Sequence, residues 1–417
     1  MKIKVKAVVP CAPRPMKESG VEWIGMIPDA WSVIMNKYLL EEMYSGGTPS
    51  ASNEEFYSED GIPFVSIGDM SSIRYITGTK KKLTEKGRAD KNLSVLPKGT
   101  ILYSIYATIG AVSELSIEAT ISQAILALRL KPTYDKQFYK YNLLAMRDYV
   151  FVNANGNTQF NLNAEKVWNF TFVVPPIDEQ KQIGNYLDFK CAHIDSIIEK
   201  TRASIEEYKA LKQSIITEVV TKGIRPNRKM KNSGISWISE CPEEWSVGKA
   251  KYYIVIGNGS DPKSEGDIPV YGSGSTSFKT CGEYKEGPCV LIGRKGATLH
   301  IPHYIDHNYW NVDTAFDVKA QSNYCLKYYY YVACCFDYRL YISQTTLPSM
   351  TQTSYENMFI PVPDLEEQQE IAAYLDKQCS KVDELLDKHS MLIDLLEKQK
   401  KSIVFEFVTG KKEVPSC

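Results

Sequence analysis

The sequence has few cysteines and no long apolar run. Its 10 cysteines among 417 residues are too dilute for a disulfide framework, and none forms a Cys-x-x-Cys pair, which argues against zinc ribbons and thioredoxin-like chemistry. The longest apolar stretch without a charge, residues 101–113, is shorter than the roughly 20 residues of a membrane-spanning helix, and we interpret it as a buried core segment. Residues 1–15 contain three lysines but no apolar block suited to a secretory signal, so we expect a cytoplasmic protein that does not contact the membrane.

The sequence also has almost no net charge. It has 49 Lys and Arg against 50 Asp and Glu, which gives a formal net charge of −1 at pH 7. A chain with this balance has no overall attraction to a polyanion, so a nucleic-acid site would have to be a local patch. At about 100 to 200 residues per domain, the length predicts two or three domains.

The sequence repeats itself. Residues 174–188 (VPPIDEQKQIGNYLD) return as residues 362–376 (VPDLEEQQEIAAYLD), an offset of 188. Upstream, residues 16–24 (MKESGVEWI) return as residues 230–238 (MKNSGISWI), an offset of 214. We call these repeated segments the frames and the sequence between them the inserts. Because the two offsets differ, the inserts differ in length.

Each proline-rich frame is followed by a helical period. Apolar residues recur there in steps of three and four, and most of the stripe, including its cysteine, reappears 188 residues later. This pattern is typical of a coiled-coil seam, and each helix of about 44 residues would be about 65 Å long at 1.5 Å per residue. In the first copy the seam consists of Ile183, Leu187, Cys191, Ile194, Ile198, Ile205, Tyr208, Leu211, Ile215 and Val219.

We expect the two helices to pair with each other in antiparallel orientation, although independent helical hairpins are the alternative. A parallel pair would force the second insert to carry the chain back along the whole helix. The antiparallel pair would place one globular insert at each end, related by an approximate twofold axis. The polar seam residues Thr201 and His389 would then meet near the middle and fix the register.

The two inserts are rich in short β-type runs broken by Gly, Asn, Asp and Pro. Strands are predicted at residues 62–67, 100–105 and 288–292, and helices at 137–153 and 323–341. A glycine turn at residues 257–259 is read as a hairpin and not as a nucleotide-binding loop. The predicted fold class is α+β, with two globular domains separated by a long antiparallel two-helix coiled coil.

The order of short motifs resembles the DNA-specificity subunit of a type I restriction-modification system, and the resemblance covers nearly the whole chain. The first insert has SGGTP (45–49), IPFVSIGD (62–69), LPKGT (96–100) and ATIG (107–110), in the order usual for a target-recognition domain of that family. The second has PVYGSG (269–274) and VLIGRKG (290–296), and the two PxxxEQ frames resemble the paired spacer regions. Each motif alone is weak, but the set is specific.

The resemblance implies a noncatalytic DNA-binding subunit. Each globular domain would read one half of a bipartite double-stranded DNA target, and the helices would set the spacing. Methyltransferase and restriction subunits would be the partners, and S-adenosylmethionine, Mg and ATP would be needed on those partners only. The expected parts are a tail (1–15), a first recognition domain (16–176), a first spacer helix (177–222), a basic linker (223–229), a second recognition domain (230–363), a second spacer helix (364–411) and a final tail (412–417).

Candidate DNA-binding residues are the clustered cations and the polar loop residues. Cations would contact phosphates and position each domain, whereas amides and hydroxyls would read base edges. For any single cation, an ordinary surface position is the alternative. The candidates in the first insert are Arg74, Lys80, Lys81, Lys82, Lys86, Arg88, Lys91, Gln159 and Asn161. Those in the second are Ser273, Thr276, Lys279, Lys285, Arg294 and Lys295.

No catalytic or metal-binding residue is predicted. A Walker A loop is absent, and Glu207 and Lys209 lie on faces that flank the helical seam, which disfavours a nuclease site. His300 and His303 would face opposite sides of a strand, which disfavours zinc. The alternative function is a coiled-coil adaptor that joins proteins without binding DNA. Binding to phosphates would weaken steeply with salt, and an adaptor would show no such duplex affinity.

Overall fold

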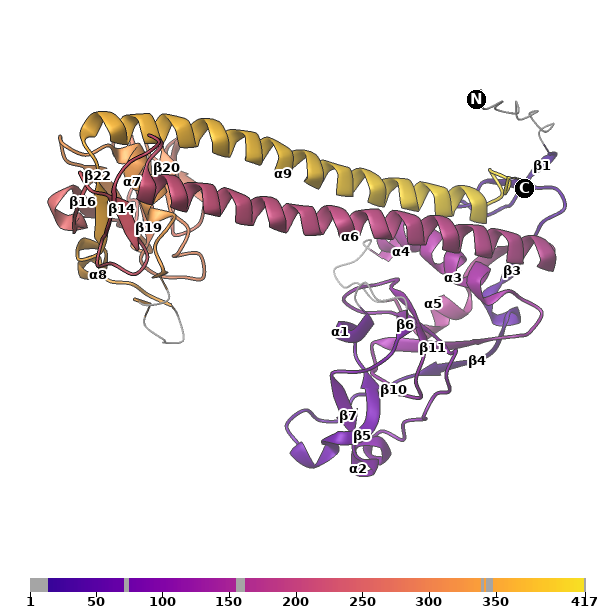
Figure 1. Cartoon of the computed structure of the whole chain (residues 1–417). Coiled ribbons are helices and arrows are strands. Elements are labelled where there is room, and N and C mark those ends of the chain that lie inside the picture. The colour runs from indigo at the N-terminus through magenta and orange to yellow at the C-terminus, as the bar shows by residue number, and fades with distance from the viewer. Residues whose placement is uncertain (1–13, 71–74, 155–161, 339–340, 343–347, 416–417) are drawn as a thin grey trace, which may run out of the picture. The chain divides into compact units, whose positions relative to one another are not determined.

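The computed structural model describes residues 14–70, 75–154, 162–338, 341–342 and 348–415. By its internal contacts the chain forms two compact units: unit 1 contains residues 1–199 and 393–417, and unit 2 contains residues 200–392. Each unit has an α+β globule and a part of each of two long helices, α6 (Ile177–Lys222) and α9 (Leu365–Val408) (Figure 1). The predicted α+β class and the two long helices are confirmed.

The globule of unit 1 is built on a five-stranded sheet of order β4-β11-β8-β9-β6 and a three-stranded sheet of order β10-β5-β7. Its strands are β1 (Met16–Glu18), β2 (Met26–Pro28), β3 (Ser32–Met35), β4 (Leu40–Ser45), β5 (Tyr57–Val65), β6 (Tyr75–Ile76), β7 (Lys81–Leu83), β8 (Ile101–Ser104), β9 (Val112–Leu115), β10 (Thr120–Ile121), β11 (Ile125–Leu130) and β12 (Thr171–Val174). Its helices before α6 are η1 (Asn36–Tyr38), η2 (Glu54–Phe56), α1 (Ile67–Met70), α2 (Glu85–Asp90), α3 (Lys136–Ala145), α4 (Arg147–Ala154) and α5 (Ala164–Trp168).

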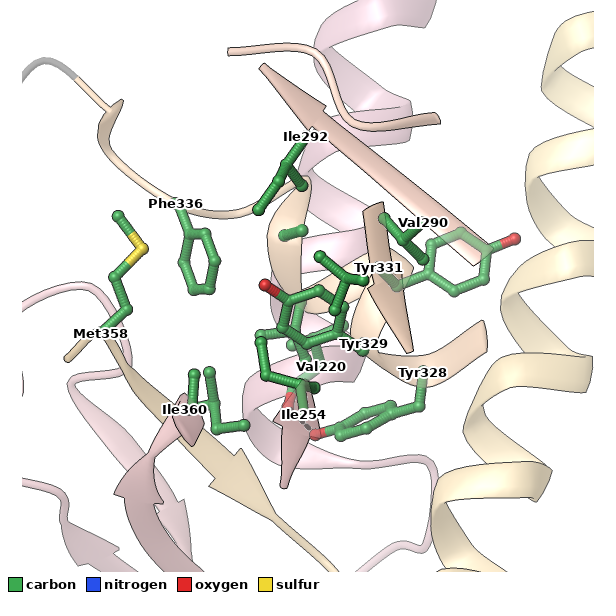
Figure 2. Close-up of a cluster of buried hydrophobic side chains, with 14 of the residues drawn as sticks. Val220, Ile254, Val290, Ile292, Tyr328, Tyr329, Tyr331, Phe336, Met358 and Ile360 are labelled. Carbon is green, nitrogen blue, oxygen red and sulfur yellow. Dashed lines mark hydrogen bonds between the residues drawn. The ribbon is translucent and has the colours of Figure 1, made fainter. Parts of the chain in front are cut away.

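Unit 2 repeats this plan with sheets of order β16-β22-β19-β20 and β18-β17-β21. Its strands are β13 (Met230–Asn232), β14 (Glu240–Pro242), β15 (Ser246–Lys249), β16 (Ile254–Asn258), β17 (Ile268–Tyr271), β18 (Lys279–Cys281), β19 (Cys289–Gly293), β20 (His303–Ile305), β21 (Trp310–Asn311), β22 (Ala315–Ala320) and β23 (Phe359–Val362). Its shorter helices are η3 (Ala250–Tyr252), α7 (Leu326–Ala333) and α8 (Gln352–Glu356). The main core of this unit packs both sheet and helix residues around Tyr328 and Tyr329 (Figure 2).

A glycine at the end of β4 and another just after β16 have the same role in the two units. A Cβ on Gly46 would lie 2.2 Å from the Ile121 carbonyl oxygen, and a Cβ on Gly259 would lie 2.0 Å from the Val312 carbonyl oxygen. Only glycine allows backbones to approach this closely. Because β16 pairs with β22 and belongs to a different sheet from β17, the hairpin predicted at residues 257–259 is wrong.

The two long helices run antiparallel in both units, as predicted. In unit 1, Lys400 Nζ of α9 contacts Asp195 Oδ1 of α6 at 2.6 Å. In unit 2, Lys212 Nζ of α6 contacts Asp383 Oδ1 of α9, also at 2.6 Å. Each aspartate and each lysine has its counterpart 188 residues away, so the pairing obeys the repeat found in the sequence.

The seam differs from its prediction at Leu211, which is 48% exposed and so lies outside the seam. The His389 ring contacts the Tyr208 ring, with centroids 5.3 Å apart, and the predicted meeting of His389 with Thr201 stays a prediction. Ile194, Ile198 and Leu396 are buried together, as the helical period predicted.

The glutamine of each PxxxEQ frame connects the start of a long helix to the globule. Gln180 Nε2 donates to the Pro175 carbonyl at 2.8 Å, and its Oε1 accepts from the Asp135 backbone N–H at 2.8 Å. In unit 2, Gln368 Nε2 donates to the Pro363 carbonyl at 2.9 Å, and its Oε1 accepts from the Cys325 backbone N–H at 2.7 Å. Buried amides with both ends satisfied hold the entry angle of each helix.

The glutamate of each frame forms a second connection, which we call the anchor. Glu179 accepts from Arg14 Nη1 at 2.7 Å and from Trp31 Nε1 at 2.8 Å. In unit 2, Glu367 accepts from Arg228 Nη2 and from Trp245 Nε1, both at 2.9 Å. The Glu367 backbone N–H also donates to Asp364 Oδ1 at 2.8 Å, which caps the start of α9.

Two predicted helices have different bounds in the structure. The helix expected over residues 137–153 is divided at Met146 into α3 and α4. Of the helix expected over residues 323–341, the part of the range that the structure describes contains α7, Leu326–Ala333. The strands expected at residues 62–67, 100–105 and 288–292 are present as β5, β8 and β19.

The two cores differ in whether one buried tyrosine hydroxyl has a hydrogen-bond partner. In unit 1, Tyr139 Oη donates to Asn36 Oδ1 at 2.8 Å. In unit 2, Tyr329 and Ala250 stand at the equivalent positions. The Tyr329 hydroxyl is buried and has no hydrogen-bond partner among the residues that the structure describes (Figure 2).

This difference predicts opposite effects of the same substitution. Tyr329→Phe should leave the free energy of unfolding of unit 2 unchanged or raise it by about 1 kcal/mol, because an unpaired buried hydroxyl is removed. Tyr139→Phe should lower that of unit 1 by about 1–3 kcal/mol, because Asn36 Oδ1 loses its donor. Hydrogen exchange of peptides from each unit, followed against denaturant, measures both values. A larger loss from Tyr329→Phe would contradict the assignment.

Candidate nucleic-acid interface

Equivalent loops follow the buried central strands of the two units. In unit 1 the Ile105 backbone N–H, just after β8, donates to the Ala124 carbonyl at 2.9 Å. In unit 2 the Arg294 backbone N–H, just after β19, donates to the Thr314 carbonyl at 2.8 Å. These matching bonds align Ile105 with Arg294, so residues 105–110 and 294–299 are counterparts. We call them the central loops.

Both central loops turn through the left-handed backbone region. Ala107 has φ of 55° and the aligned Gly296 has φ of 115°. A left-handed alanine is strained, and such strain concentrates at functional sites. The Ser104 hydroxyl supports the unit 1 turn by donating to the Thr108 carbonyl and accepting from the Ala111 backbone N–H at 3.0 Å.

The side chains on the two central loops differ in chemistry. In unit 1, Ile105 is buried at 6% exposure and Tyr106 is 42% exposed. In unit 2 the aligned residues are the cations Arg294 and Lys295. The Arg294 guanidinium carbon lies 5.5 Å from the centroid of the buried Phe316 ring, and Lys295 Nζ lies 3.5 Å from Asp313 Oδ2.

A second loop of unit 2, residues 272–278, joins its central loop. Ser273 Oγ lies 3.3 Å from Thr298 Oγ1, which also donates to the Ser273 carbonyl at 3.0 Å. Thr276 is exposed in this loop, and Lys279 follows it at the start of β18 with Nζ 5.6 Å from the Phe278 ring. The structure therefore brings Ser273, Arg294 and Lys295 together, with Thr276 and Lys279 on the adjoining loop and strand. Their contacts with DNA stay predictions.

The lysine run of unit 1 lies on a different feature, beside β7. Lys80 and Lys81 are exposed, Lys82 is half-buried, and Lys81 Nζ lies 5.5 Å from the Tyr57 ring. The three lysines line a pocket of about 520 Å³ with Tyr57 and Thr79. Glu54 and Glu59 also line it, so its charge is mixed, and nothing in this geometry selects a nucleic acid over another partner.

Two further unit 1 candidates are engaged in local ion pairs. Lys86 pairs with Glu55, and its hydrogen bond holds the pKa of Glu55 below the usual value. Arg88 Nε contacts Glu85 Oε2 at 2.8 Å. Such pairing reduces the positive charge available to phosphates. Arg74, Gln159 and Asn161 lie outside the described residues.

Lys285 has a structural role instead of the expected place in a phosphate footprint. Its Nζ donates to Asp317 Oδ1 at 2.5 Å, to Asn311 Oδ1 at 2.8 Å and to the Asn258 carbonyl at 2.9 Å. An ammonium group has three N–H donors, and all three are used here. No donor is left for DNA.

Sequence reasoning missed Tyr106 and Thr298. Tyr106 lies in residues 101–113, which were interpreted as one buried core segment, but β8 ends at Ser104, and Tyr106 and Ala107 are exposed. The signal was available in the repeat, because the aligned residues of the second copy are Arg294 and Lys295. A core segment would not place two cations there.

His303 lies in β20, and His307 Nδ1 is 2.9 Å from Asp306 Oδ1. Over the described ranges, no three His, Cys, Asp or Glu side chains form a group able to hold a metal ion. Within the same part of the chain, no helix is both long and apolar enough to cross a membrane.

The repeated units, paired helices and unlike loops agree with a family assignment. The family model for the type I restriction modification DNA specificity domain matches residues 28–207 and 249–390. These matches cover more than half of the chain, which therefore belongs to this family. It is a DNA-specificity subunit with two recognition domains, as its repeat and motif order predicted.

Individual relatives support the same family assignment. The chain is 24% identical to the "Putative type I restriction enzyme MjaX specificity subunit" of Methanocaldococcus jannaschii over 94% of this chain and 96% of that protein. It is 31% identical to the type I restriction enzyme HindI specificity subunit of Haemophilus influenzae over 41% of this chain and 36% of that protein. A solved structure described as "Structural basis underlying complex assembly and conformational transition of the type I R-M system" matches 93% of this chain and 99% of its own, with TM-score 0.69 and 16% identity. At that identity the likeness supports the fold alone.

Proposed function

We propose that each unit reads one half of a bipartite duplex target and that α6 and α9 set the distance between the halves. The observation that carries this proposal is the pair of central loops, which occupy equivalent places on repeated frames yet present unlike side chains. Two readers of different half-sites need this combination, because the frame positions the reader and the loop chooses the base.

The helices have a length suited to a spacer. α6 has 46 residues and α9 has 44, and straight helices of this size would extend about 65–70 Å at 1.5 Å per residue. Half-sites on one face of B-DNA recur about every 34 Å. A pair of helices this long therefore suits half-sites that are separated by unread base pairs.

The chain itself is proposed to be noncatalytic. Methyltransferase subunits would supply S-adenosylmethionine chemistry, and restriction subunits would use ATP and Mg. The chain would give these partners their target sequence. With a net charge of −1, tight duplex binding is expected only in the complex with the methyltransferase, because phosphate contacts need positive charge.

The proposal is tested by exchange of one insert. Replacing residues 17–174 with the corresponding insert of a relative, in a host that carries the methyltransferase partner, should change one half of the methylated sequence and leave the other half intact. Sequencing of methylated genomic positions measures this result. Exchange of the second insert, residues 230–361, is the matched control and should change only the other half. A change in both halves from one exchange would contradict the modular reading.

A further inference from the structure

The Arg294 side chain is positioned to bind a ligand. Its guanidinium carbon lies 5.5 Å from the centroid of the Phe316 ring, which is only 3% exposed and makes an edge contact with the Tyr355 ring at 6.2 Å. Among the residues that the structure describes, the Arg294 side chain has no hydrogen bond or ion pair. A stacked guanidinium keeps its planar fork ordered and leaves its five N–H donors free.

The backbone of Arg294 is fixed on both sides. Its N–H donates to the Thr314 carbonyl at 2.8 Å, and its carbonyl accepts from the Met350 N–H at 2.9 Å. The next turn is held by the Gly296 N–H, which donates to the Pro348 carbonyl at 3.0 Å. A side chain on so constrained a backbone loses little freedom on binding, which favours a specific contact.

The comparison of the units indicates what the guanidinium contacts. A phosphate contact carries no sequence information, so two readers on one frame could share it. The aligned residue of unit 1, however, is Ile105, which is buried and apolar. The cation is thus particular to unit 2, as a base-reading group of one half-site would be.

We propose that Arg294 reads a guanine in the half-site of unit 2, by donating two hydrogen bonds to O6 and N7 in the major groove. This is the geometry by which an arginine fork selects guanine over the other bases. The neighbouring Lys295 carries a point charge without a planar fork, so we assign it to a phosphate contact, although its Nζ also lies 3.5 Å from Asp313 Oδ2. The inference rests on the proposed function, since it requires that unit 2 bind duplex DNA.

The test uses the full chain assembled with its methyltransferase subunits and a duplex library with randomised half-site bases. Selected and methylated duplexes are sequenced for the parent and for Arg294→Lys, Arg294→Ala and Lys295→Ala. Arg294→Lys keeps the charge and most of the stem but removes the fork. Both Arg294 variants are expected to reduce the preference for guanine at one position of one half-site by roughly 5- to 150-fold, with other positions unchanged.

The Lys295→Ala variant separates base reading from phosphate contact. It is expected to weaken binding to all sequences about equally and to reduce the slope of log affinity against log salt by about 1. Equal loss at all positions in the Arg294 variants, an unchanged preference, or loss at a position that is not guanine would overturn the inference. If the parent complex selects no sequence, the proposed function itself fails. If the parent complex selects a sequence and the Arg294 variants keep the same preference, only the role of Arg294 is refuted.

Discussion

Replacing Arg228 with methionine is expected to lower the free energy of unfolding of unit 2 by about 3–5 kcal/mol, the cost of leaving a buried charge without its partner. The Glu367 side chain is only 1% exposed and that of Arg228 12% exposed. The guanidinium holds both carboxylate oxygens, with Nη2 to Oε2 at 2.9 Å. After the substitution, Trp245 Nε1 is the remaining side-chain donor to that carboxylate among the described residues.

The first anchor supplies the matched control. Arg14 Nη1 contacts Glu179 Oε1 at 2.7 Å while its Nη2 donates to the Gly410 carbonyl at 2.9 Å, and the Arg14 and Glu179 side chains are 22% and 29% exposed. Water can solvate Glu179 when its partner is lost, so Arg14→Met should cost unit 1 only about 1 kcal/mol. Hydrogen exchange of peptides from both units, followed against denaturant in the full chain, measures the two losses side by side.

A third variant tests the cause. Glu367→Gln in the Arg228→Met background removes the unpaired charge and keeps an acceptor for Trp245, so it should recover part of the lost stability. Equal losses from the two arginine substitutions would show that burial of the carboxylate does not set the cost. No recovery in the double variant would point to lost packing of the arginine stem.

The frames could be predicted from sequence because their information is local and repeated. The helical period fixes the buried face of α6 and α9. The stripe residues Ile183 and Leu187 are buried in unit 1, and their counterparts Ile371 and Leu375 are buried in unit 2. The repeat also explains each PxxxEQ motif, since the glutamine and the glutamate have equivalent partners in both copies. Leu211 was misplaced because an apolar residue at helical spacing can still face solvent, and its counterpart Gln399 was the available warning.

The candidate interface was only partly predictable because its loops depend on distant backbone contacts. Arg294 is positioned by Met350, which lies 56 residues later in the chain, and no local pattern reveals that bond. Charge clustering likewise cannot separate a free cation from an engaged one. Arg294 and Lys285 looked alike in the sequence, yet Lys285 is bound to an aspartate in the middle of an apolar strand.

Lys285→Met should destabilise unit 2 by about 3–5 kcal/mol, because Asp317 would keep a charge in a buried place without its cation. The Asp317 side chain is 9% exposed, and its Oδ2 also accepts from the Tyr309 hydroxyl at 3.2 Å. Asn311 Oδ1 and the Asn258 carbonyl would lose a donor as well. The denaturant dependence of hydrogen exchange in β19 and β22 measures this loss.

Unit 1 shows how the Lys285–Asp317 ion pair can be replaced. Its residue aligned with Asp317 is Ala127, which lies in an apolar cluster with Leu102 and Ile121. Lys285→Met combined with Asp317→Ala imitates that solution and should be more stable than Lys285→Met alone, since an apolar replacement of both partners avoids the unpaired charge. If Lys285 served mainly to bind phosphate, Lys285→Met would instead weaken duplex binding while leaving the exchange of β19 and β22 unchanged. The two readouts together decide whether this cation belongs to the core or to the DNA-binding surface.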